Sequence, residues 1–237
     1  MYCLWCHEEM IPEITWRNVF QFFADPPPLC TDCQQKLPLI EGPVCPGCSR
    51  PSKTRPSKTR PSEKENLCPD CLKWNAHPNL SGMLKQNVSV YSYSAFMKEV
   101  MAKWKYRGDY ELVHMFKNSI QKRYKEQFPK QGLTAVPIPL SEARQKERGF
   151  NQAEALAGLL KLPLTHALTR IKNEKQAKKS RAERLKSSNP FQITQAVQSP
   201  VLLIDDLYTT GATLHWAASL LKSNGTPEIY SFTLIRS

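Results

Sequence analysis

The chain has 237 residues, enough for one medium domain or for a domain with a small module beside it. Hydrophobic residues make up 41% of it, and no apolar run approaches the length that spans a bilayer. Because a signal-peptide pattern is also absent, we predict a cytoplasmic protein without membrane insertion. The formal net charge of +12 favours an anionic partner, either nucleic acid or a phosphorylated metabolite, although a solvated basic surface also fits.

The first third of the chain is rich in cysteine and has little periodicity. Its eight cysteines form four C-x-x-C pairs, at Cys3/Cys6, Cys30/Cys33, Cys45/Cys48 and Cys68/Cys71. The first two pairs are 23 residues apart and the last two 19, and each spacing suits a ribbon in which two such turns close on one tetrahedral zinc ion. Redox pairs are the less favoured alternative, because they normally open a helix after a strand. We predict a double zinc ribbon over residues 1–78, with one or two zinc ions.

Joining the first pair with the second and the third with the fourth is the simplest arrangement, and a crossed pairing also fits the spacing. Between Cys48 and Cys68 the pentapeptide R-P-S-K-T is repeated in tandem at residues 50–59. The repeat contains no apolar residue that could anchor it, so it predicts a basic loop.

The pattern after residue 78 changes to alternating strands and helices. We predict strands at residues 88–93, 133–138, 201–204 and 229–235. Apolar residues spaced at helical intervals predict helices at residues 96–104, 112–124, 152–160 and 211–223. Residues 170–190 are charged and are interpreted as a long loop. Short apolar strands that alternate with helices predict an α/β domain over residues 79–237, with a parallel sheet flanked by helices.

The most informative segment is residues 201–213, which reads V-L-L-I-D-D-L-Y-T-T-G-A-T. Its apolar start predicts a strand buried on both faces, and parallel sheets bind ligands at the carboxyl ends of such strands. The following turn leads into a helix, so unpaired N–H groups and the helix dipole favour an anion there. Gly211 lets the backbone approach a phosphate group, while Asp205 and Asp206 are placed to accept hydrogen bonds from two ribose hydroxyl groups.

This segment resembles the phosphoribosyl pyrophosphate (PRPP) signature of type I phosphoribosyltransferases and matches it at every defining position. The resemblance implies the type I phosphoribosyltransferase fold and PRPP bound together with Mg²⁺. The implied PRPP-binding residues of the segment are Asp205, Asp206, Thr209, Thr210, Gly211, Ala212 and Thr213. Asp205 and Asp206 are also the candidate catalytic residues, should the protein be an enzyme.

A second loop, V-P-I-P-L-S at residues 136–141, ends a strand about one strand–helix–strand unit upstream. In this enzyme class the equivalent loop turns its backbone amides toward the pyrophosphate group. The implied contacts are Pro137, Ile138, Pro139 and Leu140, with Arg144 and Arg148 as neutralising cations. The basic stretch at residues 170–184 fits a lid over PRPP and a solvated charged loop equally well.

The order of motifs along the chain resembles the ComF family over nearly its whole length. Four cysteine pairs precede K-Y-R-G-D at residues 105–109, and V-P-I-P-L-S, R-G-F-N-Q-A at residues 148–153 and the PRPP signature follow. The tandem R-P-S-K-T insert departs from the family pattern. The resemblance implies a role in DNA uptake or in handling the imported single strand during natural transformation. A competence helicase or another DNA-uptake protein is then a candidate partner.

Basic and aromatic residues interleave at one place, as a groove for single-stranded DNA requires. The candidate nucleic-acid contacts are Lys103, Lys105, Tyr106 and Arg107. Trp104 fits both a stacking platform and the buried face of its helix, and we favour the buried face. Two other functions remain open: an active phosphoribosyltransferase with an unknown acceptor, and a PRPP sensor without chemistry.

Overall fold

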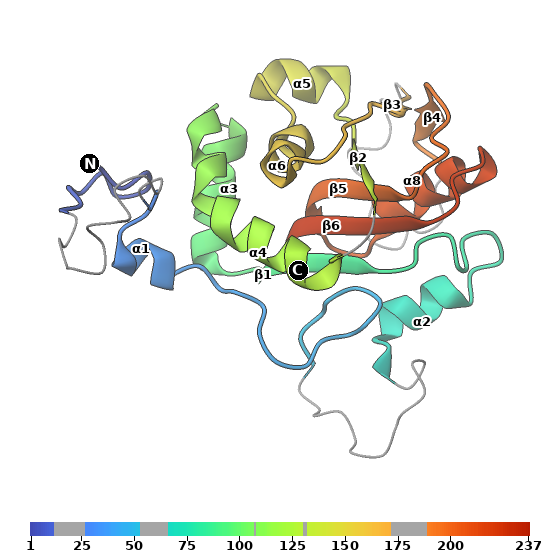
Figure 1. The fold of residues 1–237 in the computed structure, drawn as a ribbon, viewed down its shortest axis with the longest axis horizontal. Coiled ribbons are helices and arrows are strands. Elements are labelled where there is room, and N and C mark those ends of the chain that lie inside the picture. Colours follow the sequence, from blue (N-terminus) through green and yellow to red (C-terminus); the bar gives the residue numbers. More distant parts are fainter. Residues whose placement is uncertain (12–26, 53–65, 107, 130–131, 172–188) are drawn as a thin grey trace.

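The structure is a computed structural model, and it describes residues 1–11, 27–52, 66–106, 108–129, 132–171 and 189–237 (Figure 1). Most of the tandem R-P-S-K-T repeat, Arg107 and most of the basic stretch at residues 170–184 lie outside these ranges.

A four-stranded parallel sheet forms the centre of the molecule, with the strand order β1-β6-β5-β2 (Figure 1). Its strands are β1 (Asn87–Ser92), β2 (Thr134–Pro137), β5 (Val201–Tyr208) and β6 (Ile229–Arg236). The predicted parallel sheet is therefore confirmed. β5 is an inner strand and continues to Tyr208, four residues beyond its predicted end, because it stays paired with β6 as far as Arg236.

Helices cover the sheet. They are α3 (Ala95–Tyr106), the 3-10 helix η3 (Tyr110–Phe116), α4 (Lys117–Gln127), α5 (Glu142–Arg148), α6 (Gln152–Leu160) and α8 (Ala212–Ser223). The single helix predicted at residues 112–124 is wrong in detail, because its first turns are a 3-10 helix that passes into α4. The sequence pattern misses α5, which is short and has no apolar stripe. Among the helices that the structure describes, none is long and apolar enough to cross a membrane.

The predicted loop at residues 170–190 needs a correction at its first residue, because Arg170 belongs to a strand. β3 (Leu168–Arg170) pairs with β4 (Phe191–Ile193) in an antiparallel two-stranded sheet. Each strand has only three residues, which is too short to give a periodic pattern. The charged residues between them favour a loop, so the sequence does not predict that the two strands pair.

Alternate side chains of β5 enter two separate cores, as the two-residue period of a strand requires. Leu202 and Ile204 join a core formed with α3, α4 and α6. Val201 and Leu203 join a second core with α8 on the opposite face. All four side chains are fully buried, which explains why this stretch is continuously apolar.

The cysteine-rich segment lies against both faces. Its two short helices, α1 (Thr31–Gln35) and α2 (Pro69–Asn75), begin directly after Cys30 and Cys68. The ring of Trp5 packs edge-on against Phe96 of α3, with 5.1 Å between ring centroids. At the other end, α2 packs against α8 through Trp74.

One strip of the sheet is polar although it is buried. Asn87, Ser89, Ser231 and Thr233 are each at most 1% exposed. Their side chains bond to one another, with 2.7 Å between the hydroxyl oxygens of Ser89 and Thr233 and 2.9 Å from the Ser231 hydroxyl to Oδ1 of Asn87. Ser49, next to Cys48, joins them by donating to the carbonyl of Asn87 at 2.9 Å.

Candidate functional site

β5 carries two carboxylates toward the carboxyl end of the sheet. Oδ1 of Asp205 accepts a hydrogen bond of 2.8 Å from the backbone N–H of Asp206. Burial, and after it the negative charge of Asp206, raises the pKa of Asp205 to about 7. Asp206 forms an ion pair with Lys105, which lies in the last turn of α3. The carboxylates therefore have different roles near neutral pH: Asp206 has a cation beside it and Asp205 can change its charge.

The turn at residues 209–213, hereafter the phosphate loop, connects β5 to α8. Gly211 is the residue before α8 and has φ of +83°, which favours glycine. A Cβ atom at this position would lie 2.2 Å from the hydroxyl oxygen of Tyr208, so a larger residue cannot be accommodated without movement. The first N–H groups of α8 have no partner within the helix, and the loop therefore offers donors to an anion.

One cavity gathers most of the predicted site. The residues that line it are Lys105, Ile138, Pro139, Leu140, Arg144, Arg148, Asn151, Gln152, Ala153, Arg170, Asp205, Asp206, Leu207, Thr209 and Thr213. Four predicted residues do not line this cavity: Pro137, Thr210, Gly211 and Ala212. Pro137, Thr210 and Ala212 are each next in sequence to a residue that lines it, and Gly211 lies between Thr210 and Ala212. Four cationic side chains face two carboxylates, a combination that suits an anionic ligand with hydroxyl groups.

Two buried donors in the cavity wall are unused. Nη1 of Arg148 donates to Oε1 of Gln152 at 2.8 Å, and both side chains are buried. Within the described ranges, neither Nε of Arg148 nor Nε2 of Gln152 has a hydrogen-bond partner. Buried donors in native proteins are nearly always paired, so these two would suit a ligand with acceptor atoms. Gln152 lies in the R-G-F-N-Q-A motif, but the sequence pattern does not predict this role.

Two further residues shape the cavity. Nδ2 of Asn151 donates to the carbonyl of Ile138 at 3.0 Å, which fixes the loop after β2 against the start of α6. Arg170, at the end of β3, is the described beginning of the basic stretch and lies over Phe191, with 5.4 Å from its Cζ to the ring centroid. Burial lowers the pKa of Arg170 from its usual value.

The eight cysteines form two groups that could each hold a metal ion. The first cysteine cluster consists of Cys3, Cys6, Cys30 and Cys33, and the second of Cys45, Cys48, Cys68 and Cys71. In each group all four sulfur atoms lie within 4.8 Å of one another, so the simplest predicted pairing is confirmed and the crossed one is wrong. Cys30 and Cys68 directly precede short helices, which is part of the context expected of redox pairs, but four sulfurs meet in each group and not two.

The sulfur separations fit zinc. A tetrahedron with zinc–sulfur bonds of 2.3 Å has edges of about 3.8 Å. The sulfurs of Cys6 and Cys30 lie 3.7 Å apart in the first cluster, and those of Cys45 and Cys71 lie 3.7 Å apart in the second. In the second cluster, the backbone N–H of Cys68 also donates to the sulfur of Cys45 at 3.2 Å, as outer-shell donors to thiolates do.

Comparison with known proteins extends over the whole chain. No family model matches it. The chain is 42% identical over 238 residues to competence protein ComFC of Bacillus subtilis, which covers 99% of this chain and 95% of the relative. The chain belongs to the ComFC family of competence proteins. Competence protein ComFC of Streptococcus pneumoniae is 33% identical over the full length of both chains, and the DNA utilization protein YhgH of Salmonella typhimurium is 27% identical over 89% of this chain and 98% of its own.

Solved structures similar to this ComFC-family chain include two phosphoribosyltransferases. A hypoxanthine phosphoribosyltransferase from Staphylococcus aureus has a TM-score of 0.35 and 16% identity, over 54% of this chain and 65% of its own. An adenine phosphoribosyltransferase from Leishmania tarentolae has a TM-score of 0.32 and 16% identity, over 69% of this chain and 89% of its own.

The candidate nucleic-acid contacts of this ComFC-family member have separate surroundings. Nζ of Lys103 lies 3.7 Å from Oδ2 of Asp109, and Lys105 is in the cavity with Asp206. Tyr106 is 62% exposed and its ring lies 5.8 Å from Cζ of Arg148, at the edge of the cavity. Trp104 is fully buried, so it is a core residue and not a stacking platform.

Proposed function

We propose that this protein binds PRPP, together with Mg²⁺, in the cavity at the carboxyl end of β5, and that it handles single-stranded DNA during natural transformation. The observation that carries the PRPP proposal is the meeting of two carboxylates, the phosphate loop and the unused donors of Arg148 and Gln152 in one cavity. A ligand that matches all three needs vicinal hydroxyl groups and phosphates on one sugar.

Each part of the cavity has a distinct task in this proposal. Asp205 and Asp206 accept hydrogen bonds from the ribose hydroxyl groups. The phosphate loop donates to the 5-phosphate through backbone N–H groups and through the hydroxyls of Thr209 and Thr213. The pyrophosphate group lies against the loop at residues 137–140, with Arg144 and Arg148 as its cations. Mg²⁺ supplies charge neutralisation of the pyrophosphate when it is bound.

Binding of PRPP also requires Lys105 to share Asp206. The ammonium group lies beside the carboxylate that would accept a ribose hydroxyl, so the ammonium group and the ligand would bind the same carboxylate. We propose that the cysteine clusters hold one zinc ion each and that the ribbon module ends at residue 78.

The DNA part of the proposal is supported by the relatives, which are named competence and DNA utilization proteins. It is also supported by the net charge of +12 and by exposed aromatic residues beside basic ones, as at Tyr106. We propose Lys103, Lys105, Tyr106 and Arg107 as contacts, and a competence helicase or another DNA-uptake protein as partner.

The deciding experiment is a PRPP titration by calorimetry, with Mg²⁺, in the presence and absence of single-stranded DNA. We expect saturable PRPP binding that the double variant Asp205→Asn/Asp206→Asn abolishes, and DNA binding that this variant retains. DNA affinity should fall steeply with salt, because phosphate contacts release counterions. Undetectable PRPP binding to the wild type contradicts the first part, and DNA affinity indifferent to salt contradicts the second.

An active phosphoribosyltransferase is the second candidate function, favoured by the carboxylate pair in the cavity. Release of pyrophosphate from PRPP on addition of bases, amines or single-stranded DNA tests it. Binding without release under all these conditions supports a protein that senses PRPP without chemistry.

A further inference from the structure

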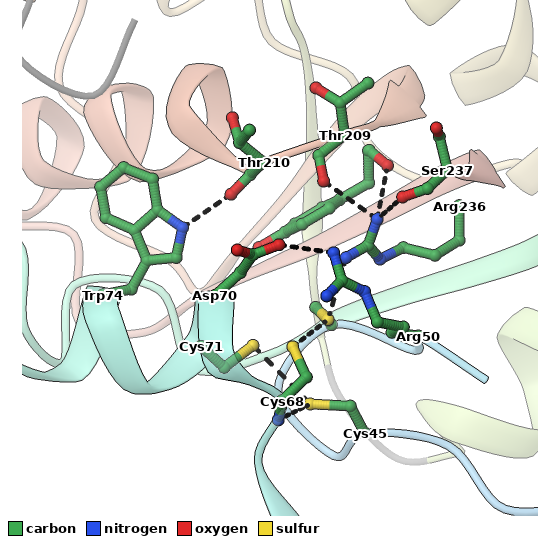
Figure 2. Close-up of polar contacts among 12 residues, drawn as sticks. Cys45, Arg50, Cys68, Asp70, Cys71, Trp74, Thr209, Thr210, Arg236 and Ser237 are labelled. Carbon is green, nitrogen blue, oxygen red and sulfur yellow. Dashed lines mark hydrogen bonds and ion pairs between the residues drawn. The ribbon is translucent and has the colours of Figure 1, made fainter. Parts of the chain in front are cut away.

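The second cysteine cluster lies beneath the phosphate loop and is connected to it by two buried side chains (Figure 2). Trp74 follows Cys71 by three residues on α2. Its indole N–H donates to the carbonyl of Thr210 at 2.7 Å, and its ring stacks on His215 of α8 with 4.2 Å between centroids. The side chain is 3% exposed, so water does not compete for this bond.

Arg236 makes the second connection, and it contacts the cluster itself. Its Nη1 donates to the carbonyl of Thr209 at 2.9 Å (Figure 2). It also donates to the carbonyl of Tyr208 at 3.1 Å. Its Nη2 donates to the sulfur of Cys48 at 3.5 Å. One rigid guanidinium group therefore joins a candidate metal ligand to the backbone of the loop.

These bonds determine where the N–H groups of the loop point. In a trans peptide unit the carbonyl and the next residue's N–H point in opposite directions. Since the carbonyls of Thr209 and Thr210 point toward the cysteine cluster, the N–H groups of Thr210 and Gly211 point away from it. The side of the loop away from the cluster is the side on which an anion would bind.

The first cysteine cluster has different contacts. It reaches the domain at α3, where Trp5 packs on Phe96, and Nζ of Lys103 lies 5.4 Å from the centroid of the Trp5 ring. Within the described ranges, no hydrogen bond joins residues of this cluster to the phosphate loop.

We propose that Trp74 and Arg236 are positioning residues that couple the second cysteine cluster to the phosphate loop. Loss of metal from that cluster then misaligns the loop and weakens PRPP binding, and PRPP in turn holds the metal more firmly, because coupling between two sites is reciprocal. This inference rests on the proposed binding of PRPP. It adds that the position of the phosphate loop depends on metal in the second cluster.

The first test compares PRPP affinities of Trp74→Phe and the matched control Trp5→Phe in the full chain, by calorimetry. Trp74→Phe keeps an aromatic ring against His215 and removes the donor to Thr210. We expect its affinity to fall about five- to tenfold, the worth of one buried hydrogen bond, at unchanged zinc content. Trp5→Phe should bind like the wild type. Equal affinity of Trp74→Phe and wild type overturns the inference.

The second test measures zinc release to a chromophoric chelator in the variant Cys6→Ser, which leaves the second cluster as the intact one. Saturating PRPP should slow release at least about threefold, and the added substitution Trp74→Phe should reduce that protection. Release that is equally fast with and without bound PRPP overturns the inference alone. A wild type that does not bind PRPP at all overturns the proposed function and, with it, the inference.

Discussion

The two cysteine clusters have the same ligands and the same local turns, yet they occupy different places in the molecule. In the first cluster Cys6 is exposed, while Cys3 and Cys33 are buried in the core on the α3 side of the sheet, where Trp5 packs on Phe96. In the second cluster Cys45, Cys48 and Cys71 are buried in the core on the α8 side of the sheet. Metal chemistry alone therefore does not define a ribbon's role. What the ribbon packs against does.

The comparison extends to the two halves of the ligand cavity. Trp74 and Arg236 connect the second cluster to the phosphate loop. α3, the helix on which the first cluster packs, brings Lys105 to Asp206, on the ribose side. The second cluster is thus bonded directly to its half of the cavity, whereas the first is connected through a helix.

The largest difference in PRPP affinity should appear when one ligand is removed from each cluster in turn. Cys48→Ser should lose one zinc ion and weaken PRPP binding by roughly a hundredfold, because it also replaces the sulfur that accepts from Arg236 with a neutral hydroxyl on a shorter bond. Cys6→Ser should lose one zinc ion and change PRPP affinity by less than about twofold, since it is distant from the loop. Zinc analysis and calorimetry check both. Equal losses of affinity would show that the clusters do not differ.

Glycine substitutions test the loop without touching a cysteine. Gly211→Ala places a Cβ atom against Tyr208 and should weaken PRPP binding by roughly thirtyfold, or about 2 kcal/mol. Gly42→Ala is the matched control, because Gly42 also has positive φ (+74°) but nothing within 4 Å. It should cost about 1 kcal/mol of stability and leave PRPP affinity unchanged. Binding by Gly211→Ala at wild-type affinity would contradict the structure of the loop.

Acid should weaken the contact at the second cluster and spare the one at the first. Burial, and after it the charge of His77, lowers the pKa of His215 to about 3, while the unfolded chain titrates near 6.5. The unfolded state therefore binds the extra proton first, and stability falls as the pH drops below 6.5. We expect a loss of about 2 kcal/mol between pH 6.5 and 5.

Urea unfolding at the two pH values measures this loss, and His215→Phe, which keeps a ring against Trp74, should reduce it. Phe96, the partner of Trp5, has no group that titrates, so its contact should not respond to pH. The same acid loss in His215→Phe and wild type would show that another group is responsible.

The smallest effect concerns the ribose side. The pKa of Asp205 is raised to about 7 and its ionised form is the better acceptor for a ribose hydroxyl, so PRPP affinity should fall as the pH drops from 8 to 6. We expect about a tenfold larger fall in the wild type than in Asp205→Asn, because the titration of PRPP itself is common to both. Parallel pH profiles would show that Asp205 does not bind in its ionised form.

Local patterns predicted much of this architecture. Continuous apolar residues revealed β5, and the C-x-x-C spacing predicted both clusters. The spacing favoured the observed pairing as the simplest one, but it also fitted a crossed pairing. The helix at Gln152–Leu160 is predicted to the residue, since its apolar stripe is complete. These features depend on neighbours in sequence, which a single sequence displays.

Contacts between distant residues were not predictable in this way. Trp74 and Thr210 are separated by 136 positions, and nothing near Trp74 distinguishes it from an ordinary core residue. Lys105 was predicted among the DNA contacts because of its basic and aromatic neighbours. Its place beside Asp206 depends on how α3 meets β5, which only the fold reveals.

The buried polar strip beneath the second cluster has a consequence for how the protein comes apart. When Ser49 and its neighbours leave the sheet, they uncover the hydroxyl and amide groups of Asn87, Ser89, Ser231 and Thr233. Water hydrogen-bonds to such groups readily, so the surface exposed at this strip does not favour non-specific association with other chains. It accepts only a partner with matching hydrogen bonds. Transient detachment of the second ribbon should therefore be reversible there, with reattachment in one orientation.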